Sequence, residues 1–244
     1  MILTSVIRDL LRQRRARTSV TTDRRPAAAP TTPDSGPTVA RPKPARYSGP
    51  GPAVLNVGGN NKQIPIPDHY RGWAHLLLDI DPAGNPDIVC DARELATLDP
   101  AQFDAIYCSH NLEHYFKHDG ARVLTGFLHV LKPTGFAEIR VPDLKSVMQH
   151  VVATGMDIED TLYVSPMGPI AVRDVIYGLG RQIERSGNDF FAHKCGFTAR
   201  SLRAALELAG FRTVYVVESP EAFEVRALSF KGAPTGDQRA LLRL

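Results

Sequence analysis

Cysteine and long apolar runs are both scarce in this sequence, and each absence excludes a class of protein. The chain of 244 residues contains three cysteines, Cys90, Cys108 and Cys195, none of them in a C-x-x-C pair. That spacing argues against a disulfide framework and against a cysteine-based zinc site. No run reaches the roughly 20 apolar residues that span a bilayer, so we expect no integral membrane protein. We therefore expect a reducing, cytoplasmic location, with membrane-peripheral attachment as the alternative.

The positive charge of the chain belongs to its first part. Residues 1–52 contain ten Lys or Arg and three Asp, whereas residues 53–244 contain 19 basic and 23 acidic residues. The basic isoelectric point therefore does not indicate that the main body binds nucleic acid, and no nucleic-acid partner is expected.

Two segments precede the main body. Residues 1–17 repeat apolar side chains at helical spacing beside several arginines, which predicts a short basic amphipathic helix. Such a helix can lie on an anionic membrane, dock on a partner, act as a transit peptide or have no role, and these alternatives stay open. Residues 18–52 are rich in Pro, Thr, Ala and Arg, a composition that predicts a disordered linker.

From residue 53 onward, strand-like and helix-like segments alternate. This alternation predicts an α/β fold, a Rossmann-like, mostly parallel sheet with helices on both faces. We expect strands at 54–57, 75–80, 88–90, 104–108 and 136–141, and helices at 121–131 and 198–209. The second helix has Thr198 as its expected N-cap and is closed by Gly210.

The end of the chain distinguishes this sheet from the six-stranded dinucleotide fold. The strand-like runs 213–217 and 224–230 are separated by about six residues, whereas a parallel crossover needs about a dozen or more. The two runs must therefore pair antiparallel if they pair directly. The domain is expected over residues 53–232, with a lid insertion at 143–197 and a C-terminal tail at 233–244.

Six motifs follow one another in an order typical of one family. They are VLNVGGNN (54–61), LLLDIDP (76–82), DIVCDARELATL (87–98), FDAIYCSHNLEHY (103–115), HVLKPTGFAEIRVPDL (129–144) and AHKCGFTARSLRAALELAGF (192–211). In this order the sequence resembles the class I S-adenosylmethionine-dependent methyltransferases, and in particular a shortened, type 11-like branch. The resemblance covers about residues 53–232 and implies S-adenosylmethionine as cofactor. Its implied acceptor is a small molecule, a glycan or a lipid-linked group.

The resemblance also implies a cofactor site at the ends of the first two strands. Gly58, Gly59 and Asn60 are expected to lie under the methionine part of the cofactor, because glycine allows a tight turn and close backbone approach. Asp79 is expected to accept hydrogen bonds from the ribose hydroxyls. Asp81 is the second candidate for that role, on the opposite side of the strand if the strand continues.

Three further residues are expected to complete the cofactor site. By resemblance, Asp91 accepts a hydrogen bond from the adenine amino group and the amide of Ala92 faces the ring. A capping role for Asp91 in the turn that follows is the alternative. Ser109 leaves the fourth strand at its carboxyl end, where open α/β sheets bind ligands.

His110 and His193 are the expected catalytic residues. A methyl group on a sulfonium is already activated, so the reaction depends chiefly on positioning, and a histidine would act as a base only for a hydroxyl acceptor. His110, Glu113 and His114 also spell H-x-x-E-H, a zinc motif when it lies within a helix. Because a strand runs almost directly into His110, we expect no metal site. Capping or packing is the alternative role for His193.

Two departures from the family pattern leave other functions open. Asn60 occupies the position of the second glycine, and Pro65 and Pro67 interrupt the helix that ordinarily follows, so a shortened loop is expected there. A catalytically silent binding or scaffold module is the main alternative function. A nicotinamide-dependent oxidoreductase is less favoured, because Gln63 replaces the third glycine of its fingerprint. The sequence does not indicate an oligomeric state.

Overall fold

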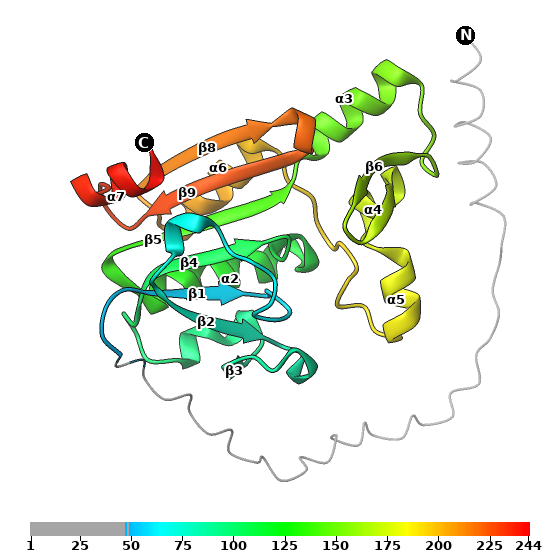
Figure 1. Ribbon diagram of the computed structural model, residues 1–244. Helices are drawn as coiled ribbons and strands as arrows, with labels where there is room; N and C mark the ends of the chain where they lie inside the picture. The colour runs from blue at the N-terminus through cyan, green and yellow to red at the C-terminus, as the bar shows by residue number, and fades with distance from the viewer. Residues whose placement is uncertain (1–46, 48) are drawn as a thin grey trace, which may run out of the picture. The chain divides into compact units, whose positions relative to one another are not determined.

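The computed structural model describes Tyr47 and residues 49–244 (Figure 1). The helix expected over residues 1–17 and nearly all of the expected linker 18–52 lie outside the described residues. Among the residues that are described, no helix is long and apolar enough to cross a membrane.

A seven-stranded sheet forms the centre of the fold, with the strand order β3-β2-β1-β4-β5-β9-β8. The strands are β1 (Ala53–Val57), β2 (Ala74–Asp79), β3 (Ile88–Val89), β4 (Phe103–Ser109), β5 (Leu131–Pro142), β8 (Thr213–Ser219) and β9 (Glu224–Phe230). The first five pair in parallel. All five residues of β1 are buried, as expected for a strand covered on both faces.

The C-terminal hairpin is antiparallel, as its short connection predicts. Thr213 pairs with Phe230 and Ser219 pairs with Glu224, while β9 also runs antiparallel to β5. The sheet is therefore mostly parallel with a two-stranded antiparallel edge, which confirms the expected fold class.

The two faces of the sheet are covered differently. The helices α2 (Lys117–Val130) and α6 (Ala199–Ala209), with the 3₁₀ segment η4 (Ala92–Thr97), pack on one face over the larger core cluster. The other face is covered by the short helix η2 (Asp68–Tyr70) and by α7 (Gly236–Leu242).

The thin cover of the second face follows from the sequence. Pro65 and Pro67 prevent the helix that would ordinarily link the first two strands, and only η2 forms between β1 and β2. Trp73 and Tyr70 pack there against Phe136 of β5. The expected tail 233–244 contributes α7, whose Leu242 is buried on this face.

The predicted caps and several of the predicted boundaries are present. Thr198 accepts a hydrogen bond from the amide of Ser201 at the start of α6, and Gly210 ends that helix in the left-handed region at φ 112°. Helix α2 differs from the prediction because it begins at Lys117, four residues earlier than expected, and Leu131 already belongs to β5.

The insertion 143–197 folds as a small layer of its own beyond the carboxyl ends of the parallel strands (Figure 1). It consists of α3 (Leu144–Thr154), β6 (Thr161–Ser165), β7 (Gly168–Ala171), α4 (Val172–Tyr177) and α5 (Gly180–Ser186). Strands β6 and β7 form an antiparallel hairpin separate from the main sheet. Four buried side chains form the insertion's core: Val147, Ile170, Val172 and Val175.

Candidate functional site

A cavity of about 510 Å³ lies at the carboxyl ends of the parallel strands. Its size falls in the range of about 300–1,000 Å³ that is typical of small-molecule sites. The lining residues come from the loops after β1, β2, β3 and β4, from the first turn of α2 and from the end of the insertion. The cavity is therefore the place where the cofactor residues expected from sequence can be tested.

The loop after β1 is as tight as its glycines predict. Gly58 has a left-handed φ of 71°, and a Cβ at that position would overlap the side chain of Asn111. A Cβ at Gly59 would overlap the side chain of Asn56. Asn60 takes the left-handed region at φ 61°, which asparagine tolerates better than most residues. Gly58 and Asn60 border the cavity, so the altered glycine pattern still forms the expected turn.

Asp79 stands where a ribose-binding acid should stand, at the end of β2 and on the cavity wall. Its Oδ2 accepts a hydrogen bond from the amide of Asn60 at 3.0 Å, and its Oδ1 accepts one from the amide of Asp81 at 3.0 Å. A carboxylate has about four acceptor positions, so two remain for a pair of vicinal hydroxyls. Asp81 also borders the cavity, but its Oδ1 caps the turn η3 (Pro82–Gly84) through the amide of Ala83.

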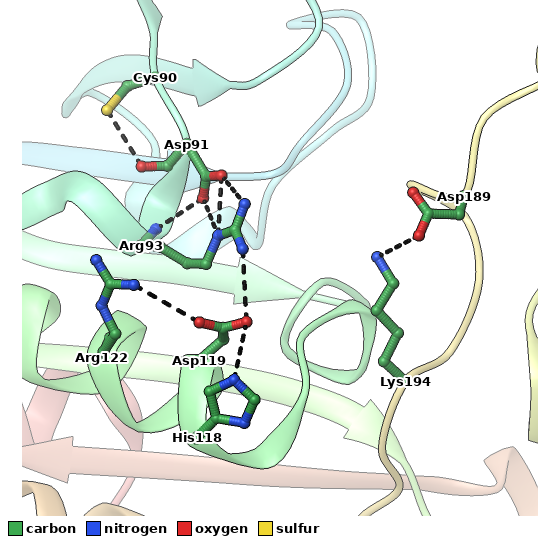
Figure 2. Close-up of polar contacts among 8 residues, drawn as sticks. All are labelled: Cys90, Asp91, Arg93, His118, Asp119, Arg122, Asp189 and Lys194. Carbon is green, nitrogen blue, oxygen red and sulfur yellow. Dashed lines mark hydrogen bonds and ion pairs between the residues drawn. The ribbon is translucent and has the colours of Figure 1, made fainter. Parts of the chain in front are cut away.

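Asp91 is held by its own neighbours. The carboxylate accepts a hydrogen bond from the amide of Arg93 at 2.9 Å and pairs with the Arg93 guanidinium, whose Nη2 lies 2.6 Å from Oδ2 (Figure 2). Arg93 also reaches Asp119 of α2 at 3.5 Å. Partial burial tends to raise the pKa of Asp91, but the bonds from Arg93 outweigh it and lower the pKa.

The pairing of Asp91 with Arg93 competes with the adenine contact expected for Asp91. Its four acceptor positions are largely used by Arg93, so an adenine amino group would have to share or displace that arginine. The capping alternative weighed from sequence is present, and Asp91 still borders the cavity. Ala92 is buried at the start of η4. Ser109 ends β4 beside Arg140 but is not among the residues that line the cavity.

The residues present thus fit S-adenosylmethionine at the ribose and methionine positions. Gly58 allows the tight turn that the Asn111 side chain packs against on the cavity wall, and Asp79 keeps free acceptor capacity there. At the adenine position the fit requires Arg93 to share or release Asp91.

Several lining residues were not singled out from sequence. Tyr115 and Phe116 follow the strand β4 after one short turn, and Phe190 and Lys194 come from the end of the insertion. Phe116 and Phe190 are unusually exposed for their size, at 53% and 43%. Lys194 pairs with Asp189 at 3.1 Å, across the cavity from the Arg93 and Asp119 pair (Figure 2). In the sequence, only the adjacent aromatic residues Tyr115 and Phe116, just past the end of a strand, could have indicated part of this cavity wall.

His110 lies at the cavity, but its charge state differs from the one expected. It takes a left-handed φ of 50°, and its Nε2 lies 3.2 Å from Glu224 while its Nδ1 lies 3.6 Å from Glu113. Partial burial tends to lower its pKa, but the two carboxylates outweigh burial and raise the pKa of His110 to about 10. At neutral pH the imidazole is therefore already protonated, and it does not offer a base in this arrangement.

His193 lies behind the cavity wall rather than on it. Its Nδ1 donates to the carbonyl of Val175 at 2.9 Å, its ring is mostly buried, and it packs edge-on against His114 with ring centroids 4.9 Å apart. Burial is the main cause that lowers the pKa of His193. The packing alternative considered from sequence therefore describes its contacts better than direct contact with an acceptor does.

The charges around the cavity are unequal. Five aspartates border it: Asp79, Asp81, Asp91, Asp119 and Asp189. Arg93, Lys194 and the protonated His110 are the positive side chains among the same lining residues. The excess of negative charge favours a cationic group inside the cavity and disfavours a polyanion.

One family model matches part of the chain. Residues 75–139 match the model described as a methyltransferase domain. The matched segment runs from β2 to β5 and includes Asp79, Asp91 and His110. A search of curated protein sequences finds no match.

Three similar solved structures have low sequence identity to this chain. The chain is 16% identical to a SAM dependent methyltransferase from Archaeoglobus fulgidus, over 74% of this chain and 86% of that chain, with a TM-score of 0.46. It is 17% identical to the 1,6-didemethyltoxoflavin-N1-methyltransferase of Burkholderia thailandensis, over 75% and 72% of the two chains, with a TM-score of 0.40. It is 15% identical to human N-acetylserotonin methyltransferase, over 74% and 48%, with a TM-score of 0.43.

Proposed function

We propose that this chain uses S-adenosylmethionine to methylate a small, uncharged or cationic acceptor in the cavity at the strand ends, and the match of residues 75–139 to a methyltransferase domain model supports the proposal. S-adenosylmethionine supplies an activated methyl group on a positively charged sulfur when bound. The excess of aspartates around the cavity carries the proposal, because it matches that charge.

We propose roles for the cofactor residues expected on the sheet side of the cavity. The turn at Gly58 and Asn60 supports the methionine portion, and the free acceptor positions of Asp79 take the ribose hydroxyls. Asp91 and the amide of Ala92 remain proposed for the adenine, with Arg93 moving aside or sharing the carboxylate. Ser109 is proposed only as support at the end of β4, since it does not line the cavity.

The acceptor is proposed to enter from the insertion side. Phe116 and Phe190 offer apolar faces there, and Lys194 offers one charged donor. A cavity of about 510 Å³ shared with a cofactor suits a small molecule or the reacting end of a glycan or lipid-linked group. The negative wall argues against a nucleic acid as acceptor.

Methyl transfer from a sulfonium depends mainly on holding donor and acceptor in line in a site that excludes water. We propose that the protonated His110 acts by orienting an acceptor oxygen or nitrogen rather than by removing its proton. His193 is proposed to act indirectly, through its contact with Glu113.

Calorimetric titration of the full chain with S-adenosylhomocysteine tests the proposal. We expect saturable binding, and Asp79→Asn should weaken it by about tenfold to a hundredfold, the range for losing hydrogen bonds to a charged group. Asp81→Asn is the matched control and should change binding by less than about threefold, because its side chain caps η3 instead.

Three outcomes are informative. Absence of binding to a folded wild-type chain would reject the enzyme and favour the silent binding module. Equal losses for Asp79→Asn and Asp81→Asn would reject the assigned ribose position. Binding of NADH in place of S-adenosylhomocysteine would favour the nicotinamide-dependent alternative.

A further inference from the structure

A second cluster of possible ligands lies directly behind the cavity wall. Glu113 and His114 belong to the single 3₁₀ turn η5 (Leu112–His114), and His193 comes from the end of the insertion. The two segments are tied together because the amides of Lys194 and Cys195 both donate to the carbonyl of Glu113, at 2.8 and 3.1 Å. One ligand atom from each of Glu113, His114 and His193 lies within 4.8 Å of the other two.

The carboxylate of Glu113 has no hydrogen-bond partner within the described part of the chain. The residue is 1% exposed, and neither Oε1 nor Oε2 accepts a hydrogen bond. Its nearest charged or polar side-chain neighbours are the protonated His110, with Nδ1 at 3.6 Å, and the neutral His193, with Nε2 at 4.0 Å. Buried carboxylates ordinarily accept hydrogen bonds or bind a metal ion, and the ion pair with His110 at 3.6 Å supplies neither, so both oxygens have unused capacity for a ligand.

Each of the two imidazoles has one ring nitrogen fixed by a backbone carbonyl. His114 Nδ1 lies 3.1 Å from the carbonyl oxygen of Ala192, and His193 Nδ1 lies 2.9 Å from that of Val175. A carbonyl only accepts, so each Nδ1 carries a hydrogen and each neutral ring has its lone pair on Nε2. A backbone carbonyl that fixes Nδ1 in this way is the common outer support of a histidine that binds metal through Nε2.

We propose that Glu113, His114 and His193 form a binding site for a divalent transition metal of the zinc class. Two histidines and one carboxylate are the ligand set of several open zinc sites, in which a fourth position is left for water or substrate. His114 also lines the cavity, so the site adjoins the proposed acceptor side. The inference rests on this cluster, which shares Glu113 and His193 with the proposed function, and the two are tested by separate measurements.

The proposed set differs from the H-x-x-E-H pattern considered from sequence. That motif needs a helix, whereas η5 is one turn, and His110 pairs through Nε2 with Glu224 at 3.2 Å. His193, about 80 residues away in sequence, takes the place that His110 would have in a helical motif. The expectation of no metal site considered only His110 as the third ligand, and the proposed set replaces it with His193. Bonds of about 2.0–2.1 Å would require the three ligand atoms to draw closer together than they lie here.

The test uses the full chain without a histidine tag, freed of metal with a chelator and titrated with zinc chloride and with cobalt chloride. We expect one equivalent of each metal to bind and Co²⁺ to show the intense visible absorption of a four-coordinate site. His193→Gln and His114→Gln should each weaken binding more than about 100-fold, since even outer-shell changes cost about 10–100-fold. His118→Gln is the control, because that ring is exposed and outside the cluster.

Two results of the metal titrations would overturn the proposed site. Failure of the folded wild-type chain to bind either metal at one equivalent would overturn the site, and so would binding that His193→Gln leaves unchanged. If a variant fails to fold, the Co²⁺ spectrum of the wild type decides, because weak six-coordinate absorption would also overturn it. Titration of S-adenosylhomocysteine into the metal-free chain reports separately on the proposed function.

Discussion

The two walls of the cavity are built in different ways. The sheet-side wall is formed by turns at the ends of β1, β2 and β3, which extend from strands buried in the main core. The insertion-side wall comes from residues 189–194, which follow α5 in an insertion whose own core has four buried side chains. Eight of the fifteen large apolar side chains that the described chain exposes lie in the insertion. The comparison indicates that the sheet-side wall, proposed to bind the cofactor, is firmly packed, whereas the insertion-side wall, proposed to face the acceptor, is loosely packed.

The largest expected effect is on the free energy of unfolding, and it differs between the main core and the core of the insertion. Leu206 of α6 is fully buried in the main cluster, and Leu206→Ala should lower the free energy of unfolding by about 2–5 kcal/mol. Ile170 of β7 is 8% exposed in the small cluster, and Ile170→Ala should cost near the low end of that range. Chemical denaturation measures both. Equal losses, with equal loss of S-adenosylhomocysteine binding, would show that the two walls form one cooperative unit.

The next effect concerns the cofactor wall alone. Gly58→Ala would force a Cβ into the Asn111 side chain at a left-handed φ, and we expect at least about a 100-fold loss of S-adenosylhomocysteine affinity from strain and displacement together. Gly72→Ala is a close control, because Gly72 has φ 85° but nothing within 4 Å of a Cβ. Calorimetry should show near-normal affinity for this control. If both variants lose binding alike, backbone strain rather than close approach explains the loss.

The smallest effect concerns Arg93 and its pH dependence. The pKa of Asp91 is lowered in the folded chain, so its pairing adds stability above its unfolded pKa of about 3.9, and this is lost as pH falls through the lower folded pKa. Arg93→Ala should therefore cost up to about 1 kcal/mol of unfolding free energy at pH 7 and progressively less on acidification below about pH 4. Urea denaturation at a series of pH values measures this. A cost that stays constant with pH would indicate lost packing instead of lost pairing.

Arg93→Ala also sharpens the assignment of the adenine contact. The variant frees the carboxylate of Asp91, and its preference for S-adenosylhomocysteine over the inosine analogue, which lacks the amino group, should rise. An unchanged preference would place the adenine away from Asp91.

The sheet could be predicted from sequence because its signals are local. The short connection between 213–217 and 224–230 left only an antiparallel pairing, and Thr198 and Gly210 set the ends of α6 through contacts within one turn. The left-handed Asn60 was likewise predictable from its own chemistry. Pro65 and Pro67 correctly indicated that no full helix would link β1 and β2.

The parts that could not be predicted depend on contacts between distant residues. The sequence does not place His193 beside Glu113, and it does not show that Glu113 and Glu224 together keep His110 protonated. The pairing of Asp91 with Arg93 is close in sequence, yet it competes with a cofactor contact, and only geometry shows how much of the carboxylate is used. The internal elements of the insertion carried no clear periodicity, so the hairpin of β6 and β7 was not expected.

The first and last residues of the insertion lie side by side in space. Asp143 and Phe197 form an isolated parallel β-bridge, and the amide of Leu144 donates to the carbonyl of Phe197 at 3.0 Å. A segment whose two stems touch can be lengthened, shortened or exchanged at low cost to the scaffold that carries it. The insertion, which is proposed to form the acceptor side, is therefore a replaceable unit, and grafting another insertion onto the same stems is a direct test of whether it sets the acceptor preference.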